Sequence, residues 1–352
     1  MKSKVTSMEF LHSKLNIYSA ENVNLSSILD FFSTHFIIKN NNKINNSLAD
    51  IYIYHSNELK NINFKRGEDV YIRKSASDFF TIKAKKVFLN NQEYLRIDQT
   101  GTIINFRPEK NEIHIQLQQQ IEQKDKLTVI EIIRDLVLRH EENNGVVILH
   151  ATCAFKNNQA SIIIGSKGAG KSTTLLEFVQ KADYKFMSGD KTFIWIENNT
   201  VVASGWPDYP HLGLGTISKY PELVEKLDLK EKIKSNREDI WSTKHKIAVS
   251  PTKFKQVFPC TPPGLICSVA NMYYPRLHDS DSCVLVRKEN KAEFILPHVE
   301  SLYKEDDDYW NNYIKLSKVD SQKNSEVINA LEKLESYEIE GNGIIDGKMI
   351  TK

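Results

Sequence analysis

The segment SIIIGSKGAGKSTTLLEFV, residues 161–179, constrains the fold of this chain more than any other stretch. It begins with an apolar run that suits a short buried strand. It ends with a run that places Leu175, Leu176 and Val179 along one face of a helix. Glycines at fixed spacing separate these two runs, so the segment predicts a strand, a tight loop and a helix in that order.

The loop follows the pattern G-x-x-x-x-G-K-[ST], which binds phosphate when a strand precedes it and a helix follows it. Its glycines allow positive φ angles that turn backbone N–H groups toward one point, where the helix dipole adds positive potential. We predict that the Lys171 ammonium reaches the β- and γ-phosphates of a nucleotide and that Ser172 completes the shell of a bridging Mg²⁺. The predicted phosphate-contacting residues are Gly165, Ser166, Lys167, Gly168, Ala169, Gly170, Lys171, Ser172 and Thr173.

Composition and charge exclude several classes of function. The 352 residues include 47 Lys and Arg against 45 Asp and Glu, so we expect neither nucleic acid nor an anionic membrane as a partner. The four cysteines form no C-x-x-C pair, which disfavours a zinc site or a disulfide framework and fits a reduced cytoplasm. No apolar signal region and no run of about 18 apolar residues occurs, so we expect a cytoplasmic chain without a membrane span.

The sequence predicts two domains. Residues 49–119 form short alternating segments separated by Asn, Gly, Asp or Pro, a pattern typical of antiparallel strands. A helical run at residues 127–140 follows and would connect this region to the next. We therefore predict a smaller, mostly β N-terminal domain at residues 1–124 and a catalytic domain with a phosphate-binding loop at residues 125–352.

The second domain is predicted to contain a mixed sheet, which gives the chain a mixed α/β fold class. Two apolar strands meet at the turn KNNQ, residues 156–159, and a second hairpin is expected around Asn198 and Asn199. Residues 292–296 suit a further strand. Helices are expected at residues 220–227, 306–316 and 325–336.

Residues 145–216 resemble the kinase domain of the HPr kinase/phosphorylase family, whose core is similar to that of phosphoenolpyruvate carboxykinase. Three features carry the resemblance: VVILHATCAF at residues 146–155, GSKGAGKST at residues 165–173, and YKFMSGDKTFIWI at residues 184–196. The resemblance implies a kinase that uses ATP and Mg²⁺. One departure concerns the acidic segment, where the family commonly has two adjacent aspartates and this chain has Gly189 and Asp190.

The resemblance implies catalytic roles for Asp190, His150 and Lys171, and metal binding by Ser172 and Asp190. Asp190 would accept the proton of the acceptor hydroxyl, although an aspartate in the sequence GDK also suits a turn. His150 would assist beside the γ-phosphate, although a hydrogen-bonded core histidine fits the same strand. Three cations could each neutralise charge on the transferred group, namely Lys191, Lys246 and Arg276. The glycine pair in HLGLGTI, residues 211–217, is interpreted as a plain loop.

The sequence therefore favours an ATP-dependent kinase that transfers the γ-phosphoryl group to a hydroxyl. The favoured acceptor is a serine of a peptide or protein. The family that this chain resembles includes kinases that phosphorylate a serine of a precursor peptide. Two alternatives stay open: a kinase of small-molecule hydroxyls, and a nucleotide-binding regulatory or peptide-binding module without transfer activity. The sequence also leaves a homo-oligomer open.

Overall fold

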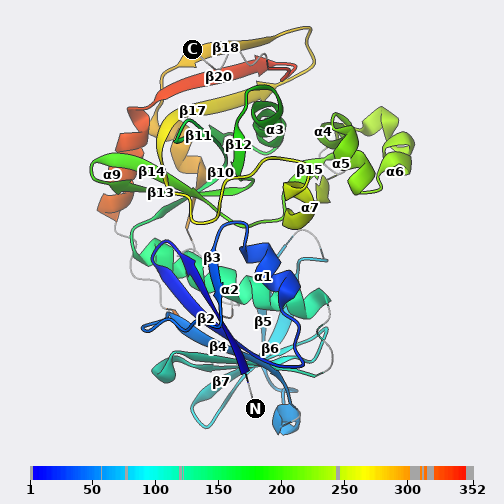
Figure 1. The fold of residues 1–352 in the computed structure, drawn as a ribbon, viewed down its shortest axis with the longest axis vertical. Coiled ribbons are helices and arrows are strands. Elements are labelled where there is room, and N and C mark those ends of the chain that lie inside the picture. The colour runs from blue at the N-terminus through cyan, green and yellow to red at the C-terminus, as the bar shows by residue number, and fades with distance from the viewer. Residues whose placement is uncertain are drawn as a thin grey trace. The chain divides into compact units, whose positions relative to one another are not determined.

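The computed structural model describes residues 3–56, 58–75, 78–118, 121, 123–242, 246–301, 310, 313–314 and 321–345. The chain divides into two compact units, which Figure 1 shows in chain colours. Unit 1 consists of Met1–Asn144 with Leu302–Val319, and unit 2 consists of Gly145–Ser301 with Asp320–Lys352. The chain therefore passes from unit 1 to unit 2, back to unit 1, and again to unit 2.

Unit 1 contains a large mixed sheet with strand order β3-β1-β2-β4-β9-β8-β7-β6-β5 in the residues that are described. The pairs β2–β4 and β4–β9 are parallel, and the other pairs are antiparallel. Its elements are β1 (Ser3–Phe10), β2 (Ser13–Ala20), α1 (Ser26–Phe32), β3 (Ile37–Asn40), β4 (Ala49–His55), η1 (Glu58–Asn61), β5 (Glu68–Arg73), β6 (Ile82–Leu89), β7 (Gln92–Ile97), β8 (Ile103–Arg107), η2 (Pro108–Lys110), β9 (Glu112–Leu117) and α2 (Gln123–Asn143).

Helix α2 decides where unit 1 ends. The predicted boundary near residue 124 falls at the start of this helix, whereas the structure keeps the whole helix in unit 1 and places the boundary after Asn144. Polar contacts explain the difference: Ser13 Oγ donates to Glu141 at 2.6 Å, and Arg73 donates to Glu131 at 2.5 Å. Ser13 lies in β2 and Arg73 in β5, so α2 is tied to two separate strands of the unit 1 sheet and belongs to that unit rather than connecting two domains.

Unit 1 also receives a second piece of chain after residue 301. Trp310 is fully buried and its ring stacks on Phe106 of β8, with 5.0 Å between the ring centroids. Such a buried aromatic pair stabilises the attachment of this piece through both apolar burial and ring stacking. The helix predicted for residues 306–316 lies outside the described residues, apart from positions 310 and 313–314.

Unit 2 holds the second large mixed sheet, in which the described strands follow the order β11-β10-β13-β14-β17-β20-β18, with β12 and β19 paired to β10. Its elements are β10 (Val147–Lys156), β11 (Gln159–Ile164), α3 (Lys171–Lys181), β12 (Lys185–Ser188), β13 (Lys191–Glu197), β14 (Thr200–Gly205), β15 (His211–Gly213), α4 (Leu214–Ser218), α5 (Pro221–Lys226), α6 (Lys230–Ser235), η3 (Arg237–Asp239), β16 (Lys246–Ala248), α7 (Pro251–Lys255), β17 (Cys267–Leu277), β18 (Cys283–Lys288), α8 (Ala292–Ile295), η4 (Leu296–His298), β19 (Val299–Glu300), α9 (Ser321–Glu332) and β20 (Glu335–Gly341).

The two predicted hairpins of unit 2 are confirmed. Strands β10 and β11 pair antiparallel around Asn157 and Asn158, and β13 pairs antiparallel with β14 around Asn198 and Asn199. All four asparagines have φ between 48° and 61°, the left-handed conformation that two-residue hairpin turns require and that Asn tolerates. Strand β11 also pairs parallel with β17, so the sheet is mixed as predicted.

The strand predicted for residues 292–296 is wrong, because α8 forms there instead. A run of five residues with apolar members fits a short strand and a buried helical turn equally well. Here the backbone N–H of Ala292 donates to Glu332 of α9 at 2.5 Å, and Ile295 is buried, which together favour the helical turn. The helix predicted at residues 220–227 is confirmed as α5.

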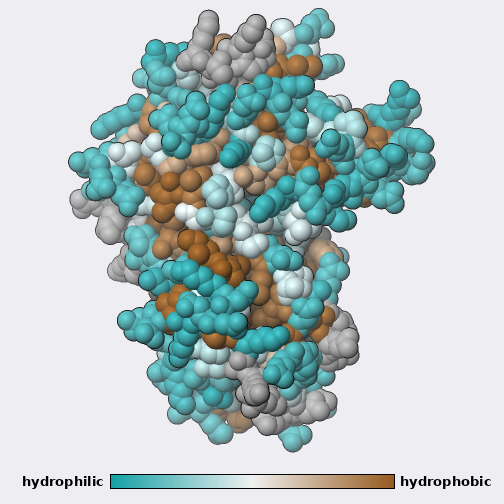
Figure 2. All heavy atoms as spheres, viewed as in Figure 1, coloured by the Kyte–Doolittle hydropathy of each residue, from teal (hydrophilic) through white to brown (hydrophobic). Residues whose placement is uncertain are grey.

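Figure 2 shows that hydrophilic side chains make up much of the face it draws, with hydrophobic patches between them. No helix within the described ranges combines the length and the apolar character that crossing a bilayer requires.

Candidate functional site

The glycine-rich loop of unit 2 joins β11 to α3, in the order that the sequence predicts. Gly168 and Gly170 have φ of 89° and 107°. A Cβ on Gly170 would lie 2.4 Å from the Leu277 side chain, so both the backbone conformation and the space exclude any larger residue. The φ of Gly165 is not positive, contrary to the prediction, and a Cβ there would instead lie 3.2 Å from Ala169.

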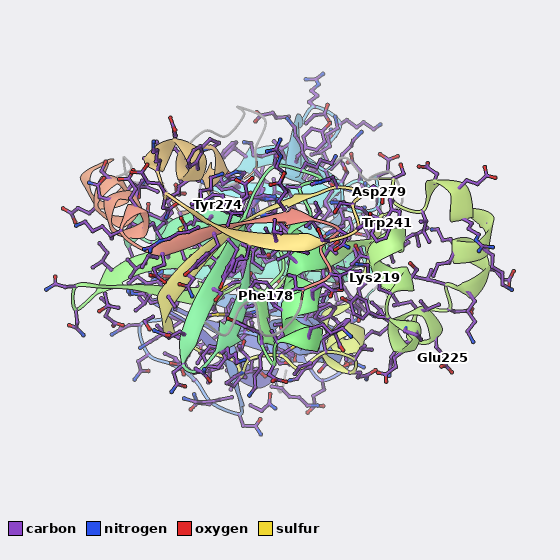
Figure 3. The ribbon with its side chains drawn as sticks, turned by 90° about the horizontal axis from the view of Figure 1, so that it is seen from above. Phe178, Lys219, Glu225, Trp241, Tyr274 and Asp279 are labelled. Carbon is purple, nitrogen blue, oxygen red and sulfur yellow. The ribbon has the colours of Figure 1, made fainter. Side chains whose placement is uncertain are left out.

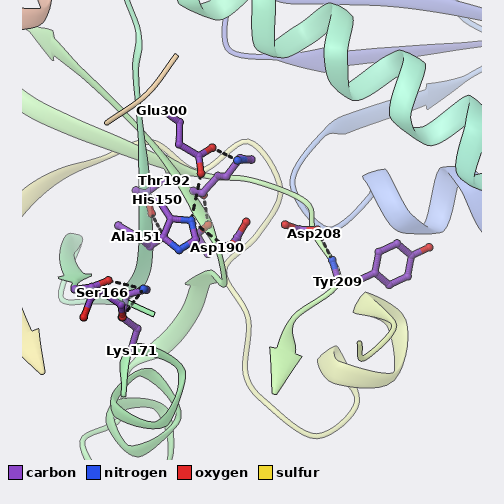
Figure 4. Close-up of polar contacts among 12 residues, drawn as sticks. His150, Ala151, Ser166, Lys171, Asp190, Thr192, Asp208, Tyr209 and Glu300 are labelled. Atoms are coloured by element: carbon purple, nitrogen blue, oxygen red, sulfur yellow. Dashed lines mark hydrogen bonds and ion pairs between the residues drawn. The ribbon is translucent and has the colours of Figure 1, made fainter. Parts of the chain in front are cut away.

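Lys171 opens α3 and its side chain folds back over the loop (Figure 4). Its ammonium donates to the carbonyl of Gly165 at 2.6 Å and lies 3.4 Å from that of Ser166. Burial lowers the pKa of Lys171, while Asp190 opposes and Lys246 adds to that shift. The loop therefore holds a partly desolvated ammonium. The dipoles of two carbonyl groups stabilise its charge, and an anion would stabilise that charge more strongly.

The predicted acid and histidine lie close together. Asp190 follows β12 and precedes β13, and its Oδ1 lies 3.5 Å from Nδ1 of His150 on β10. The structure adds Glu300 of β19, whose Oε1 lies 3.2 Å from the same Nδ1 and whose Oε2 pairs with Lys191. Figure 4 shows His150, Asp190 and Glu300 close to one another.

The surroundings of His150 favour its neutral form. Burial lowers its pKa from the ordinary value near 6.5; Asp190 opposes this shift, and Lys171, Lys191 and Lys246 add to it. A neutral imidazole carries one N–H and one acceptor nitrogen, so it can donate to only one carboxylate at a time.

A pocket of about 590 Å³ brings most of the predicted residues together. Gly165 and Ala169 of the predicted phosphate-contacting set do not line it. Its volume falls in the range of about 300–1,000 Å³ that is usual for ligand pockets. The lining residues are His150, Ser166, Lys167, Gly168, Gly170, Lys171, Ser172, Thr173, Gly189, Asp190, His211, Gly213, Gly215, Thr216, Ile240, Trp241, Ser242 and Lys246.

The three candidate cations lie in different surroundings in the structure. Lys246 of β16 lines the pocket. Lys191 pairs with Glu300. Arg276 is 75% exposed, lies 3.8 Å from Glu338 and does not line the pocket. Only Lys246 is therefore placed to face a ligand directly.

A second wall of the pocket was not predicted from the sequence. The segment HLGLGTI is not a plain loop but contains β15 and the start of α4, and it contributes His211, Gly213, Gly215 and Thr216 to the lining. Thr216 is held to Thr173 of α3 by a hydrogen bond of 2.9 Å between their hydroxyls. The close spacing of its two glycines was the signal that could have revealed this wall.

Trp241 covers part of this wall. A Cβ on Gly215 would lie 2.4 Å from the indole, and Lys219 lies 5.7 Å from its ring centroid. Figure 3 shows Trp241 and Lys219 near one another. The side chain is nevertheless 61% exposed, so an aromatic surface remains open beside the pocket.

The site fits a magnesium ion that arrives with a nucleotide. Within the described parts of the chain, no three His, Cys, Asp or Glu side chains are grouped in a way that could hold a metal alone. Mg²⁺ does not need such a cage, because it is commonly held by one or two protein oxygens together with phosphates and waters. Ser172 and Asp190 line the same pocket and offer those oxygens.

No protein-family model matches the chain, and no curated protein matches its sequence. Among solved structures, the chain is similar to the Hpr(Ser) kinase/phosphatase from Coxiella burnetii, with 12% sequence identity and a TM-score of 0.22. The matched region covers 40% of this chain and 71% of that protein.

Proposed function

We propose that this protein is an ATP- and Mg²⁺-dependent kinase that transfers the γ-phosphoryl group to a hydroxyl, in first place a serine of a peptide or protein. One observation carries the proposal. A glycine-rich loop with its lysine and a carboxylate paired to a histidine line a single pocket of about 590 Å³. Phosphate-binding groups and a base in one pocket are the two parts that phosphoryl transfer to a hydroxyl needs.

The loop would bind the phosphates. Gly168 and Gly170 keep the backbone in a conformation that would present N–H groups to the phosphates. The positive end of the α3 dipole would lie at the same place. The Lys171 ammonium, which contacts two loop carbonyls, would exchange these for phosphate oxygens. Lys246 would add positive charge from the other side of the pocket.

Ser172 and Asp190 would hold the magnesium ion through one oxygen each. When bound, such an ion would supply positive charge next to the phosphate oxygens. Because Gly189 has no side chain, Asp190 is the carboxylate at this position of the chain, and it would serve the metal and the acceptor together.

Asp190 would also orient the acceptor hydroxyl and accept its proton. The hydroxyl oxygen forms a bond to the γ-phosphorus while the bond from that phosphorus to the bridging oxygen breaks. The electron pair leaves with the nucleoside diphosphate, and the proton ends on the Asp190 carboxylate. His150 would lie beside the reacting carboxylate, with its Nδ1 3.5 Å from Asp190.

A peptide acceptor is supported by the open aromatic surface of Trp241 on the pocket wall, which suits a side chain next to the reacting serine. The two alternatives differ in how they would use this surface. A small-molecule kinase would not need this exposed surface, and a binding module would use it without any transfer.

The test is incubation of the protein with γ-³²P-labelled ATP and Mg²⁺ in three parallel arms. The first arm contains serine peptides, each matched by a copy with alanine in place of the serine, and the second contains small polyols. The third contains protein alone. We expect label on the serine peptides only, located by mass spectrometry.

Label on polyols alone would instead establish the small-molecule kinase. Saturable ATP binding without label in any arm would establish the binding module.

A further inference from the structure

We propose that Glu300 is a positioning residue, which holds Lys191 and His150 so that the Asp190 carboxylate remains available to the acceptor and the metal. This role rests on the proposed function, because it presumes that Asp190 acts as the base. No sequence pattern pointed to Glu300, which lies far along the chain from the phosphate loop.

Three neighbouring strands place these groups. The first half of β10 is flanked by β13, where His150 is the partner of Lys191, and by β19, where Ile148 is the partner of Glu300. The ladder hydrogen bonds on both sides fix the register of β10. The ammonium, the imidazole and the Glu300 carboxylate are therefore brought together by backbone pairing rather than by flexible loops.

Glu300 uses both of its oxygens here. Oε2 pairs with the Lys191 ammonium, and Oε1 lies 3.2 Å from Nδ1 of His150, within hydrogen-bond reach. The corresponding distance from His150 to Asp190 is 3.5 Å, at the edge of that reach. Since one N–H donates to one acceptor, the hydrogen bond of Nδ1 goes to Glu300 and leaves the Asp190 carboxylate outside it.

Glu300 also keeps the Lys191 ammonium from pairing with Asp190. Lys191 directly follows Asp190 in the chain, so an ammonium that Glu300 did not hold would be able to approach the proposed base. A carboxylate engaged by a lysine is a poorer proton acceptor and a poorer metal ligand. Glu300 thus supplies a second carboxylate beside His150, for positioning rather than for proton transfer.

The experiment is a double-mutant cycle of Glu300→Gln, Lys191→Gln and the double variant, in single-turnover transfer and in nucleotide titration. Glu338→Gln is the matched control, because Glu338 also pairs with a lysine, Lys288, at 2.8 Å and does not line the pocket. Circular dichroism and the thermal midpoint check that each variant is folded.

We expect Glu300→Gln to lower the transfer rate by about 10²-fold, the lower end of what a disabled general base costs. Nucleotide affinity should stay within threefold (roughly 0.7 kcal/mol). In the Lys191→Gln background, the same Glu300 substitution should cost less than about fivefold, since no ammonium is left to capture Asp190. Equal losses in both backgrounds, or an equal loss in Glu338→Gln, would show that Glu300 is merely structural.

Histidine ¹⁵N NMR supplies a measurement that does not depend on transfer activity. If Glu300 accepts the proton of His150, the ring should be in the Nδ1–H tautomer in the wild-type protein. Glu300→Gln should show a mixture of tautomers, because an amide can donate to or accept from a ring nitrogen. An Nε2–H tautomer in the wild-type protein would overturn the role of Glu300. A wild-type protein with the expected tautomer but no transfer to any acceptor would overturn the proposed function alone.

Discussion

Replacement of Lys171 by alanine should abolish phosphoryl transfer and weaken nucleotide binding by at least about tenfold, or 1.4 kcal/mol. The Lys171 ammonium would contact two phosphates as a full positive charge, and water cannot take its place in the same geometry. Its loss also removes the contact of 2.6 Å that ties the start of α3 to the carbonyl of Gly165. We expect the transfer rate to fall by about 10³-fold or more, a scale typical of a lost electrostatic contact in a transition state.

Nucleotide titration and single-turnover transfer on the same preparation measure both effects. Lys181→Ala is the matched control, because Lys181 ends the same helix, is exposed and does not line the pocket. This control should keep the wild-type affinity and rate. Wild-type turnover in the Lys171 variant would refute the phosphate-binding role of the loop.

Replacement of Asp190 by asparagine should separate binding from transfer. The substitution keeps the shape of the side chain but removes its charge and its basicity. Because Lys171 and the loop amides still hold the phosphates, we expect nucleotide affinity to stay within about tenfold, or 1.4 kcal/mol. The transfer rate should fall by about 10² or more, because the acceptor hydroxyl loses the group that orients it and takes its proton.

Asp228→Asn is the control for this variant. Asp228 is an exposed turn residue with a φ of 53°, a conformation that asparagine tolerates well, so its stability and transfer rate should not change. Full transfer by the Asp190 variant would mean that Asp190 is only a turn residue and that the base lies elsewhere. Loss of nucleotide binding comparable to that of the Lys171 variant would mean that Asp190 acts mainly through the metal.

The parts of the site that could be predicted are those that a local pattern encodes. The loop between β11 and α3 follows from glycine spacing and from the apolar runs on either side. The hairpins at Asn157 and Asn198 follow from paired asparagines, which adopt the left-handed turn conformation at little cost. In both cases the signal and the structure occupy the same few residues.

The parts that could not be predicted depend on contacts between distant segments. Glu300 reaches His150 because β19 pairs with β10, and a strand of two residues leaves no periodic signal in a sequence. Trp241 reaches the pocket because its indole rests on Gly215, a contact that no spacing rule encodes. The boundary after Asn144 likewise depends on which sheet α2 covers, while an amphipathic pattern shows only that one face is covered.

The path of the chain between the two units restricts how this protein can be recombined. The chain leaves unit 2 after Ser301, directly beyond Glu300, contributes Trp310 to the core of unit 1, and returns to unit 2 at Asp320. A crossover at any single point in the gene would therefore split one unit or both. Exchange of unit 1 for another sequence requires three breakpoints, near residues 144, 301 and 319, so that both of its segments are replaced. The two units are consequently expected to be inherited together, not as separate cassettes.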